Sequence, residues 1–121
     1  MLLYYDLETS GLDIETISIL QICILKEDSS IYKNIYMYPP DNEYGPTHIH
    51  NINVSVVEAN NGIRQEELRN EIIELLESKE KIYWVAYNNF CFDQLVFEKF
   101  CVKNNIVIPT TWYFIDIYPA I

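Results

Sequence analysis

An apolar run at the start of the chain, residues 1–5, passes directly into the acidic segment D-L-E-T-S-G-L at residues 6–12. If this region is a strand, side-chain alternation places Asp6 and Glu8 on one face, about 6 to 7 Å apart along the backbone. Two carboxylates at the end of a buried strand repel each other unless one is protonated or a cation joins them. Because oxygen ligands favour Mg²⁺ or Mn²⁺, the segment predicts a divalent-metal site. The alternative is an ordinary strand end with two solvated acids.

Size and charge limit the functions open to the chain. Its 121 residues, 50% of them hydrophobic, suffice for one domain with a single core. The net charge is −10, from 8 Lys and Arg against 18 Asp and Glu. This balance argues against binding nucleic acid by neutralising phosphates with basic side chains. Any contact with nucleic acid must therefore use metal, backbone or base stacking.

Cysteine usage and the N-terminus bear on the cellular compartment. Cys23, Cys91 and Cys101 are odd in number, have no C-x-x-C spacing and lie in apolar stretches, which predicts buried free thiols. We therefore expect a reducing, intracellular location, either cytoplasmic or nuclear. The N-terminus lacks the basic segment of a signal peptide, and no apolar run is long enough to span a bilayer, so we expect no membrane role.

Hydrophobic periodicity predicts a compact α/β domain. Strands are expected at residues 2–8, 16–26, 30–38, 82–87 and 111–118. The first three form an antiparallel meander, whereas strands that follow helices join in parallel through right-handed crossovers. Helices are expected at residues 54–60, 65–78 and 92–102. Residues 39–53, which contain Pro39-Pro40 and both histidines, are expected to form a loop.

A second informative segment, N-N-F-C-F-D at residues 88–93, lies where a buried strand gives way to a helix. Active groups gather at such boundaries in doubly wound sheets. Asp93 in the first helical turn would lean over the sheet toward Asp6 and Glu8, so that three carboxylates meet. The alternatives are that Asp93 only stabilises its helix dipole and that Asn88 or Asn89 only caps the helix.

Together, the two acidic segments resemble the DnaQ-like, or DEDD, family of 3′-to-5′ exonucleases. Residues 6–12 are similar to the first motif of that family, with its Asp and Glu. Residues 88–93 are similar to the second motif, in which a His-Asn pair precedes Phe-Asp; Asn88 replaces the His and Asn89 keeps the Asn. The resemblance implies an α/β fold of the RNase H-like type. This fold has a mixed sheet, a three-strand antiparallel meander plus parallel strands, with flanking helices.

Two weaker matches agree with this resemblance in order and spacing. His50-Asn51-Ile52 resembles a His-Gly-Ile loop of the family, with Asn in place of Gly. That loop shapes the fold in the family, so we expect no catalytic role for His48 or His50. Phe114-Ile115-Asp116 falls where the family often has an Asp-Thr at the start of a later helix.

The third motif of the family has no clear counterpart. It supplies a final metal-binding Asp preceded by a His or Tyr that deprotonates the attacking water, some tens of residues beyond the Asp-Thr segment. Trp112 and Asp116 have the spacing of a Tyr-x-x-x-Asp, but Trp cannot act as a base. We therefore expect a C-terminally truncated domain, either part of a longer protein or a naturally shortened fold.

The resemblance implies phosphodiester hydrolysis with two ions of Mg²⁺ or Mn²⁺. Asp6 would bridge both ions, Glu8 would hold the ion that activates water, and Asp93 would hold or orient the second. These three residues are the predicted catalytic and metal-binding set.

Three further residues are predicted to bind substrate, namely Thr9, Leu12 and Asn89. Thr9 and Leu12 match positions that touch the terminal nucleotide in the family, with Leu12 wedged against the base. The alternative for Leu12 is a place in the core. Phe90 and Phe92 are candidates for base stacking, although Phe92 also suits the interior.

Three functions remain open from the sequence. The first is an exonuclease domain acting on single-stranded DNA or RNA 3′ ends. The second is a catalytically inactive, nuclease-derived binding module, and the third is a proofreading or accessory domain of a larger polymerase or helicase. The joint presence of the three acids favours chemistry, since an interaction module has no need of all of them. An uncovered sheet edge would favour a homodimer.

Overall fold

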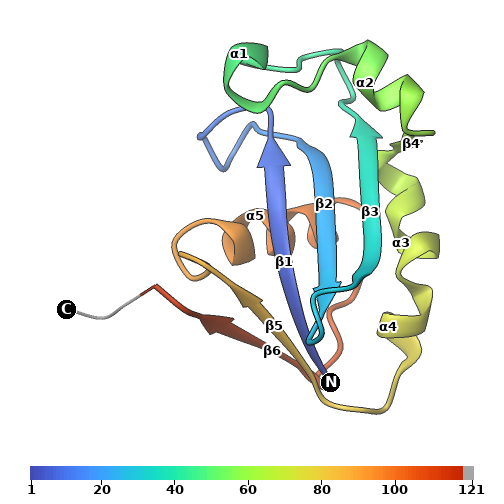
Figure 1. The fold of residues 1–121 in the computed structure, drawn as a ribbon, viewed down its shortest axis with the longest axis vertical. Coiled ribbons are helices and arrows are strands. Elements are labelled where there is room, and N and C mark those ends of the chain that lie inside the picture. Colours follow the sequence, from blue (N-terminus) through green and yellow to red (C-terminus); the bar gives the residue numbers. More distant parts are fainter. Residues whose placement is uncertain (119–121) are drawn as a thin grey trace.

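The computed structural model describes residues 1–118, which form one mixed sheet with helices beside it (Figure 1). The strand order is β4-β3-β2-β1-β5-β6. The strands are β1 (Leu2–Thr9), β2 (Ile19–Lys26), β3 (Ile31–Tyr38), β4 (Ile63–Arg64), β5 (Ile82–Ala86) and β6 (Trp112–Asp116). The strands β1, β2 and β3 pair antiparallel. On the other side of β1, β5 pairs with β1 and β6 pairs with β5, both in parallel. The predicted mixed sheet is therefore confirmed, with the short β4 as an addition that the sequence pattern did not show.

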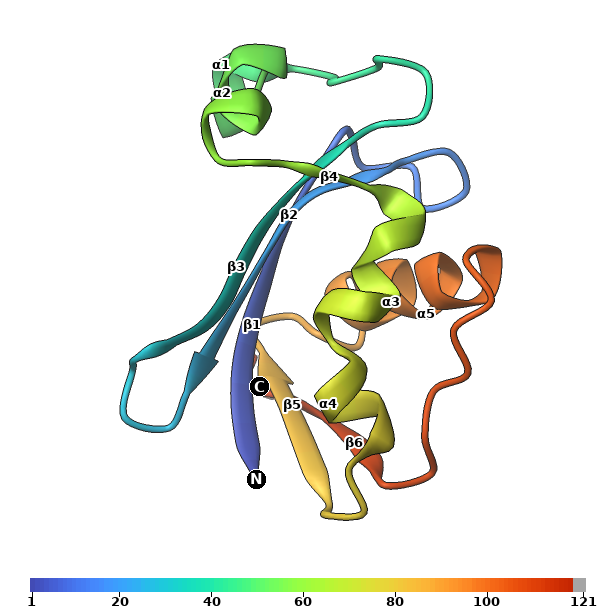
Figure 2. The ribbon, with the colours of Figure 1, turned by 90° about the vertical axis from the view of Figure 1, so that its right-hand side faces the viewer.

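The helices fall into two groups. α3 (Leu68–Glu71), α4 (Ile73–Glu77) and α5 (Asp93–Lys103) lie on one side of the sheet (Figure 2). α1 (Thr47–His50) and α2 (Val54–Ala59) lie beyond the end of the meander. None of the helices within residues 1–118 is long and apolar enough to cross a membrane.

Two predicted boundaries need correction. The expected continuous helix at residues 65–78 begins as the 3₁₀ turn η1 (Gln65–Glu67) and is interrupted at Ile72, whose φ of −114° and ψ of 19° are not helical. Ile72 is nevertheless fully buried, so packing of this β-branched side chain overrides the regular helix. The expected loop at residues 39–53 contains the single helical turn α1.

The core lies between the sheet and helices α3 to α5. On β1, Leu3, Tyr5 and Leu7 are buried, which places Asp6 and Glu8 on the opposite face, as the alternation predicts. Aromatic rings connect neighbouring strands and the two layers: the Tyr5 ring lies edge-on to Trp84 of β5 at 5.4 Å between centroids, and Trp84 lies 5.6 Å from Phe97 of α5. This packing holds β1, the strand that carries the acidic segment, firmly in the middle of the sheet.

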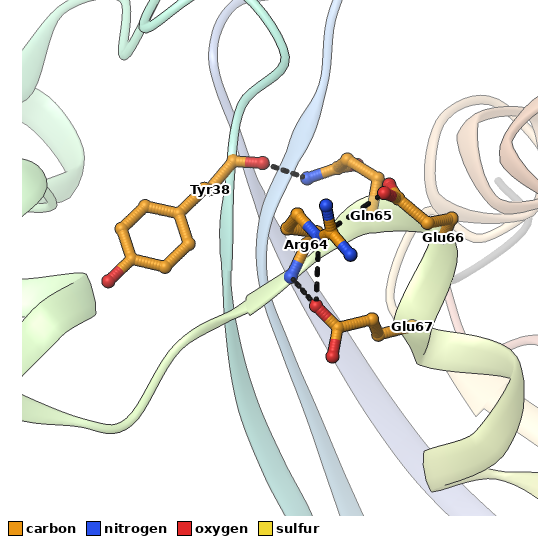
Figure 3. Close-up of polar contacts among 5 residues, drawn as sticks. All are labelled: Tyr38, Arg64, Gln65, Glu66 and Glu67. Carbon is orange, nitrogen blue, oxygen red and sulfur yellow. Dashed lines mark hydrogen bonds and ion pairs between the residues drawn. The ribbon is translucent and has the colours of Figure 1, made fainter.

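The start of η1 is attached to the meander by one amide side chain (Figure 3). Gln65 Nε2 donates to the carbonyl oxygens of Ile19 and Tyr38, both at 2.9 Å. Beside it, the N–H of Arg64 donates to Glu67 Oε1 at 3.0 Å, which caps the first turn. Both strand ends and the helix start are thus fixed together.

The cysteines only partly match expectation. All three are free thiols, and Cys101 is buried, but Cys23 is half-buried and Cys91 is exposed. Cys91 lies in the turn before α5, where the chain leaves the core, so the prediction that it is buried is wrong.

Candidate functional site

β1 and β5 separate at the level of the acidic segment. β5 pairs with β1 only from Leu2 to Tyr4, whereas β1 continues beside β2 to Thr9. After β5 the chain turns through residues 87–92 and enters α5 at Asp93 (Figure 1). Among the described residues, no strand therefore covers the second half of β1 on the β5 side, and this open edge is where α5 begins.

Three carboxylates are electrostatically coupled at this open edge. Asp93 is only 7% exposed. Desolvation, followed by repulsion from Asp6 and then from Glu8, raises the pKa of Asp93 to about 7. The nearby backbone N–H of Leu7 opposes this shift for Asp93 and, equally, for Asp6. The N–H of Leu7 is thus a shared neighbour of carboxylates from β1 and α5.

The other two acids are more accessible. Asp6 is an exposed side chain and Glu8 is half-buried. Partial desolvation raises the pKa of Asp6, and desolvation together with repulsion from Asp6 raises the pKa of Glu8. A negative charge on any one of the three carboxylates therefore makes ionisation of the other two more costly.

These residues suit a hard divalent cation, because they offer carboxylate oxygens whose mutual repulsion a cation would relieve. As placed, however, the side chains do not form a ready-made cage. Within residues 1–118, no group of three or more His, Cys, Asp and Glu side chains is arranged so that it could hold a metal ion. Since Asp6 and Glu8 lie at the surface, rotations of their side chains could bring the oxygens together without disturbing the core.

The turn after β1 is held by its own polar groups. Thr9 Oγ1 donates to the carbonyl oxygen of Gly11 at 2.7 Å. The N–H of Ser18 donates to Ser10 Oγ at 2.9 Å, which closes the base of the loop. Leu12 is 85% exposed at the far side of this turn. The alternative that Leu12 belongs to the core is therefore wrong, whereas its predicted contact with substrate stays a prediction.

Asn89 lies in the interior. It is completely buried, and its Oδ1 accepts a hydrogen bond from the hydroxyl of Tyr5. Its Nδ2 donates to the carbonyl oxygens of Trp84 at 3.2 Å and Ile115 at 3.1 Å. Asn89 thus connects β1, β5 and β6, and a direct substrate contact would require these bonds to be replaced. The side-chain cap on α5 that we considered for Asn88 or Asn89 is not formed.

Hydrogen bonds of His50 hold the loop that carries the histidines. His50 Nδ1 accepts from the N–H of Ile52 at 2.9 Å, so His50 Nε2 is the donor to the carbonyl oxygen of Tyr44 at 2.6 Å. Both ring nitrogens of His50 are thus engaged in hydrogen bonds within the loop, and the absence of a catalytic role stays a prediction. Asn51 adopts a left-handed φ of 60°. That conformation explains why Asn can stand where the family pattern has Gly.

The residues with the spacing of a third motif do not join the carboxylates. Trp112 is buried, and its Nε1 donates to the carbonyl oxygen of Leu75 at 3.2 Å. Asp116 accepts from the N–H of Phe90 at 3.1 Å and from the N–H of Tyr118 at 2.8 Å. Although desolvation raises the pKa of Asp116, these backbone donors lower it below its ordinary value.

Sequence reasoning missed Tyr5 as part of the site. Its place between Leu3 and Leu7 in an apolar run suggests only a core residue, and its partner Asn89 is 84 positions away. Burial, followed by the charge of Asp93, raises the pKa of Tyr5, so the hydroxyl stays protonated. Tyr5 therefore supports the turn before Asp93 from beneath.

Neither a family model nor a curated protein matches this sequence. Solved structures do match the fold. E. coli Exonuclease I in complex with a dA16 oligonucleotide superposes with a TM-score of 0.78 at 19% identity, over 96% of this chain and 27% of that chain. Its complex with a dT13 oligonucleotide and its zinc-bound complex with ssDNA both give 0.77, with the same identity and coverage. The likeness shows the RNase H-like fold, and the chain spans about 27% of the length of these neighbours.

Proposed function

We propose that this chain is a nuclease domain that removes nucleotides from single-stranded DNA 3′ ends, with Mg²⁺ or Mn²⁺ as cofactor. The observation that carries the proposal is the placement of Asp93. This buried carboxylate begins α5 at the open edge of β1 and is repelled by Asp6 and Glu8. Carboxylates with such perturbed pKa values cluster at functional sites. The oligonucleotide complexes of Exonuclease I support DNA as the substrate class.

Each predicted residue has a distinct task in this proposal. Asp6, Glu8 and Asp93 would hold the cations. When bound, such ions neutralise the carboxylates, polarise the phosphodiester and lower the pKa of an attacking water. Thr9 keeps the turn after β1 closed, and Leu12 presents an exposed apolar side chain to the terminal base. Asn89 keeps the turn before Asp93 in place.

No residue of the described part takes the role of the general base in this scheme. His50 has both ring nitrogens in hydrogen bonds, and Trp112 is buried and has no basic group. A missing general base reduces the rate by roughly 10²- to 10⁴-fold. We therefore expect slow digestion by this chain.

The test is digestion of a 3′-labelled single-stranded DNA in Mn²⁺ by the chain and by its Asp6→Ala variant. Glu27→Ala, in the exposed turn between β2 and β3, is the matched control because it removes the same charge far from the site. We expect at least a roughly 100-fold loss for Asp6→Ala, on the scale of one removed catalytic group. Equal digestion by Asp6→Ala would assign the activity to another protein in the preparation.

A second candidate is a binding module without hydrolysis. Two observations favour it: the carboxylates do not form a metal cage, and the described residues supply no base. This candidate predicts that the wild-type chain binds single-stranded DNA and leaves it intact over hours in Mn²⁺. The digestion assay separates the two candidates directly.

A further inference from the structure

Exposed aromatic rings gather at the ends of β5 and β6. Tyr87 directly follows β5, and Tyr118 lies two residues after the end of β6. Their ring centroids are 5.1 Å apart and their planes are tilted by 53°. Tyr87 is 61% exposed and Tyr118 is 50% exposed. Phe90, in the same turn as Tyr87, is 54% exposed. Exposed aromatic rings that gather in one patch are typical of contact surfaces. We call the pair Tyr87 and Tyr118 the aromatic platform.

The backbone beneath the platform is fixed. The carboxylate of Asp116 accepts hydrogen bonds from the N–H groups of Phe90 and Tyr118, one from each segment that carries the rings. The N–H of Ile117 donates to the carbonyl oxygen of Ala86 at 3.2 Å. These bonds join the chain just before Tyr87 to the chain just before Tyr118. The backbone that carries the two rings is therefore preorganised, which reduces the entropy lost when a ligand binds.

The platform lies next to the carboxylates. The turn that carries Tyr87 and Phe90 leads directly into Asp93. Asn89 in that turn accepts from the hydroxyl of Tyr5, the neighbour of Asp6 on β1. The two features therefore share one hydrogen-bonded junction, and a strand of a few nucleotides could reach from one to the other.

We propose that Tyr87 and Tyr118 stack a base of the single-stranded DNA whose 3′ end lies at the carboxylates, an inference that rests on the proposed function. A chain with a net charge of −10 has few cations with which to bind phosphates. Stacking needs no positive charge and accepts every base, since each base has a π face. The platform therefore supplies affinity without sequence preference.

Another aromatic pair provides a matched control. Tyr83 and Tyr113 stack, with centroids 5.4 Å apart and ring planes at 26°, and Tyr113 is 44% exposed. They lie on the same two strands, but Tyr113 comes three residues before Asp116, toward the opposite end. Removing the Tyr113 ring changes exposed aromatic surface by a similar amount without touching the platform.

The test measures the Kd of a 5′-fluorescein-labelled dT12 oligonucleotide by fluorescence anisotropy in Ca²⁺ buffer, with gel analysis to verify that the oligonucleotide stays intact. We expect Tyr87→Leu, alone or with Tyr118→Leu, to weaken binding roughly 5- to 100-fold per lost stacking contact. Tyr87→Phe keeps the ring and should bind like wild type. Tyr113→Leu should remain within about twofold, because its ring is outside the platform.

An abasic oligonucleotide of equal length and charge is the ligand-side control. It should bind weakly and with the same Kd to wild type and to the Tyr87→Leu variant. Tight binding of the abasic strand, or unchanged dT12 binding by both leucine variants, would overturn the platform and leave the nuclease proposal standing. Failure of the wild-type chain to bind or digest any single-stranded DNA would overturn both.

Discussion

Asn89 and Asp93 are buried polar side chains four residues apart, and the structure treats them in opposite ways. Asn89 is completely enclosed, and each of its amide atoms has a hydrogen-bond partner. Asp93 is 7% exposed and faces two further carboxylates, which hold its pKa near 7 together with desolvation. A satisfied amide stabilises the junction of three strands, whereas an acid held among acids costs stability. The first pattern identifies structure, and the second identifies a candidate site.

The largest effect on stability is expected from removing the hydrogen-bonded side chain of Asn89. Asn89→Ala removes the hydrogen bonds of Asn89 to the Tyr5 hydroxyl and to the carbonyl oxygens of Trp84 and Ile115. We expect the free energy of unfolding to fall by roughly 2 to 4 kcal/mol. Urea unfolding followed by tryptophan fluorescence measures it, with exposed Asn70→Ala in α3 as a control. A loss below about 1 kcal/mol would show that the junction does not depend on Asn89.

Removing the charge of Asp93 should change the free energy of unfolding in the opposite direction. The pKa of Asp93 in the folded chain is about 7, above its ordinary value of 3.8. The folded state therefore holds this proton more tightly, and the stability from Asp93 is complete below about pH 4 and is lost as pH rises through about 7. Without metal, Asp93→Asn should raise the free energy of unfolding at pH 7.5 by on the order of 2 kcal/mol.

The control for this variant is Glu27→Gln in the exposed β2–β3 turn. Urea unfolding between pH 4 and 8 should show a flatter profile for Asp93→Asn and an unchanged profile for Glu27→Gln. A profile for Asp93→Asn that stays as steep as wild type would mean that other groups produce the pH dependence.

Cation binding should neutralise the carboxylates and so remove the repulsion by which Asp93, unlike Asn89, costs stability. A ligand at ten times its Kd stabilises the folded state by about 1.4 kcal/mol. We expect Mg²⁺ or Mn²⁺ at millimolar concentration to raise the melting temperature of wild type but not of Asp93→Asn or Asp6→Asn. Potassium chloride at equal ionic strength is the control. An equal shift in all three proteins would point to a site elsewhere.

The smallest effect on stability is expected in the exposed turn after β1. Leu12→Ser should change the free energy of unfolding by less than about 0.5 kcal/mol, because the Leu12 side chain is 85% exposed. Digestion should nevertheless slow several-fold if Leu12 contacts the terminal base. Unchanged digestion would remove Leu12 from the proposed substrate contacts.

Much of the fold could be predicted because it depends on local patterns. Alternation on β1 placed Asp6 and Glu8 on one face, and the strand-to-helix boundary placed Asp93 in the first turn of α5. The break at Ile72 escaped prediction, because it depends on packing between elements. Local pattern predicts which residues form a strand or helix, but it does not contain these longer-range constraints.

The candidate site was less predictable for the same reason. The bond between Tyr5 and Asn89 spans 84 positions, and Asp116 joins segments 26 positions apart. Neither pairing leaves a periodic signal, so the structural role of Asn89 and the junction beneath Tyr87 and Tyr118 emerge only in three dimensions. Exposure of Leu12 and Cys91 likewise depends on where each turn leaves the core.

Gly45 lies close to the turn after β1, so a loop distant in sequence contacts the acidic segment. Gly45 has a φ of 68°, and a Cβ built there would lie 1.7 Å from the carbonyl oxygen of Ser10. Any side chain at position 45 would push the two loops apart. The segment around Gly45 thus contacts the turn after β1, although it carries none of the predicted catalytic residues. Substitutions in that segment would therefore change the shape of the turn beside the predicted site and leave every carboxylate in place.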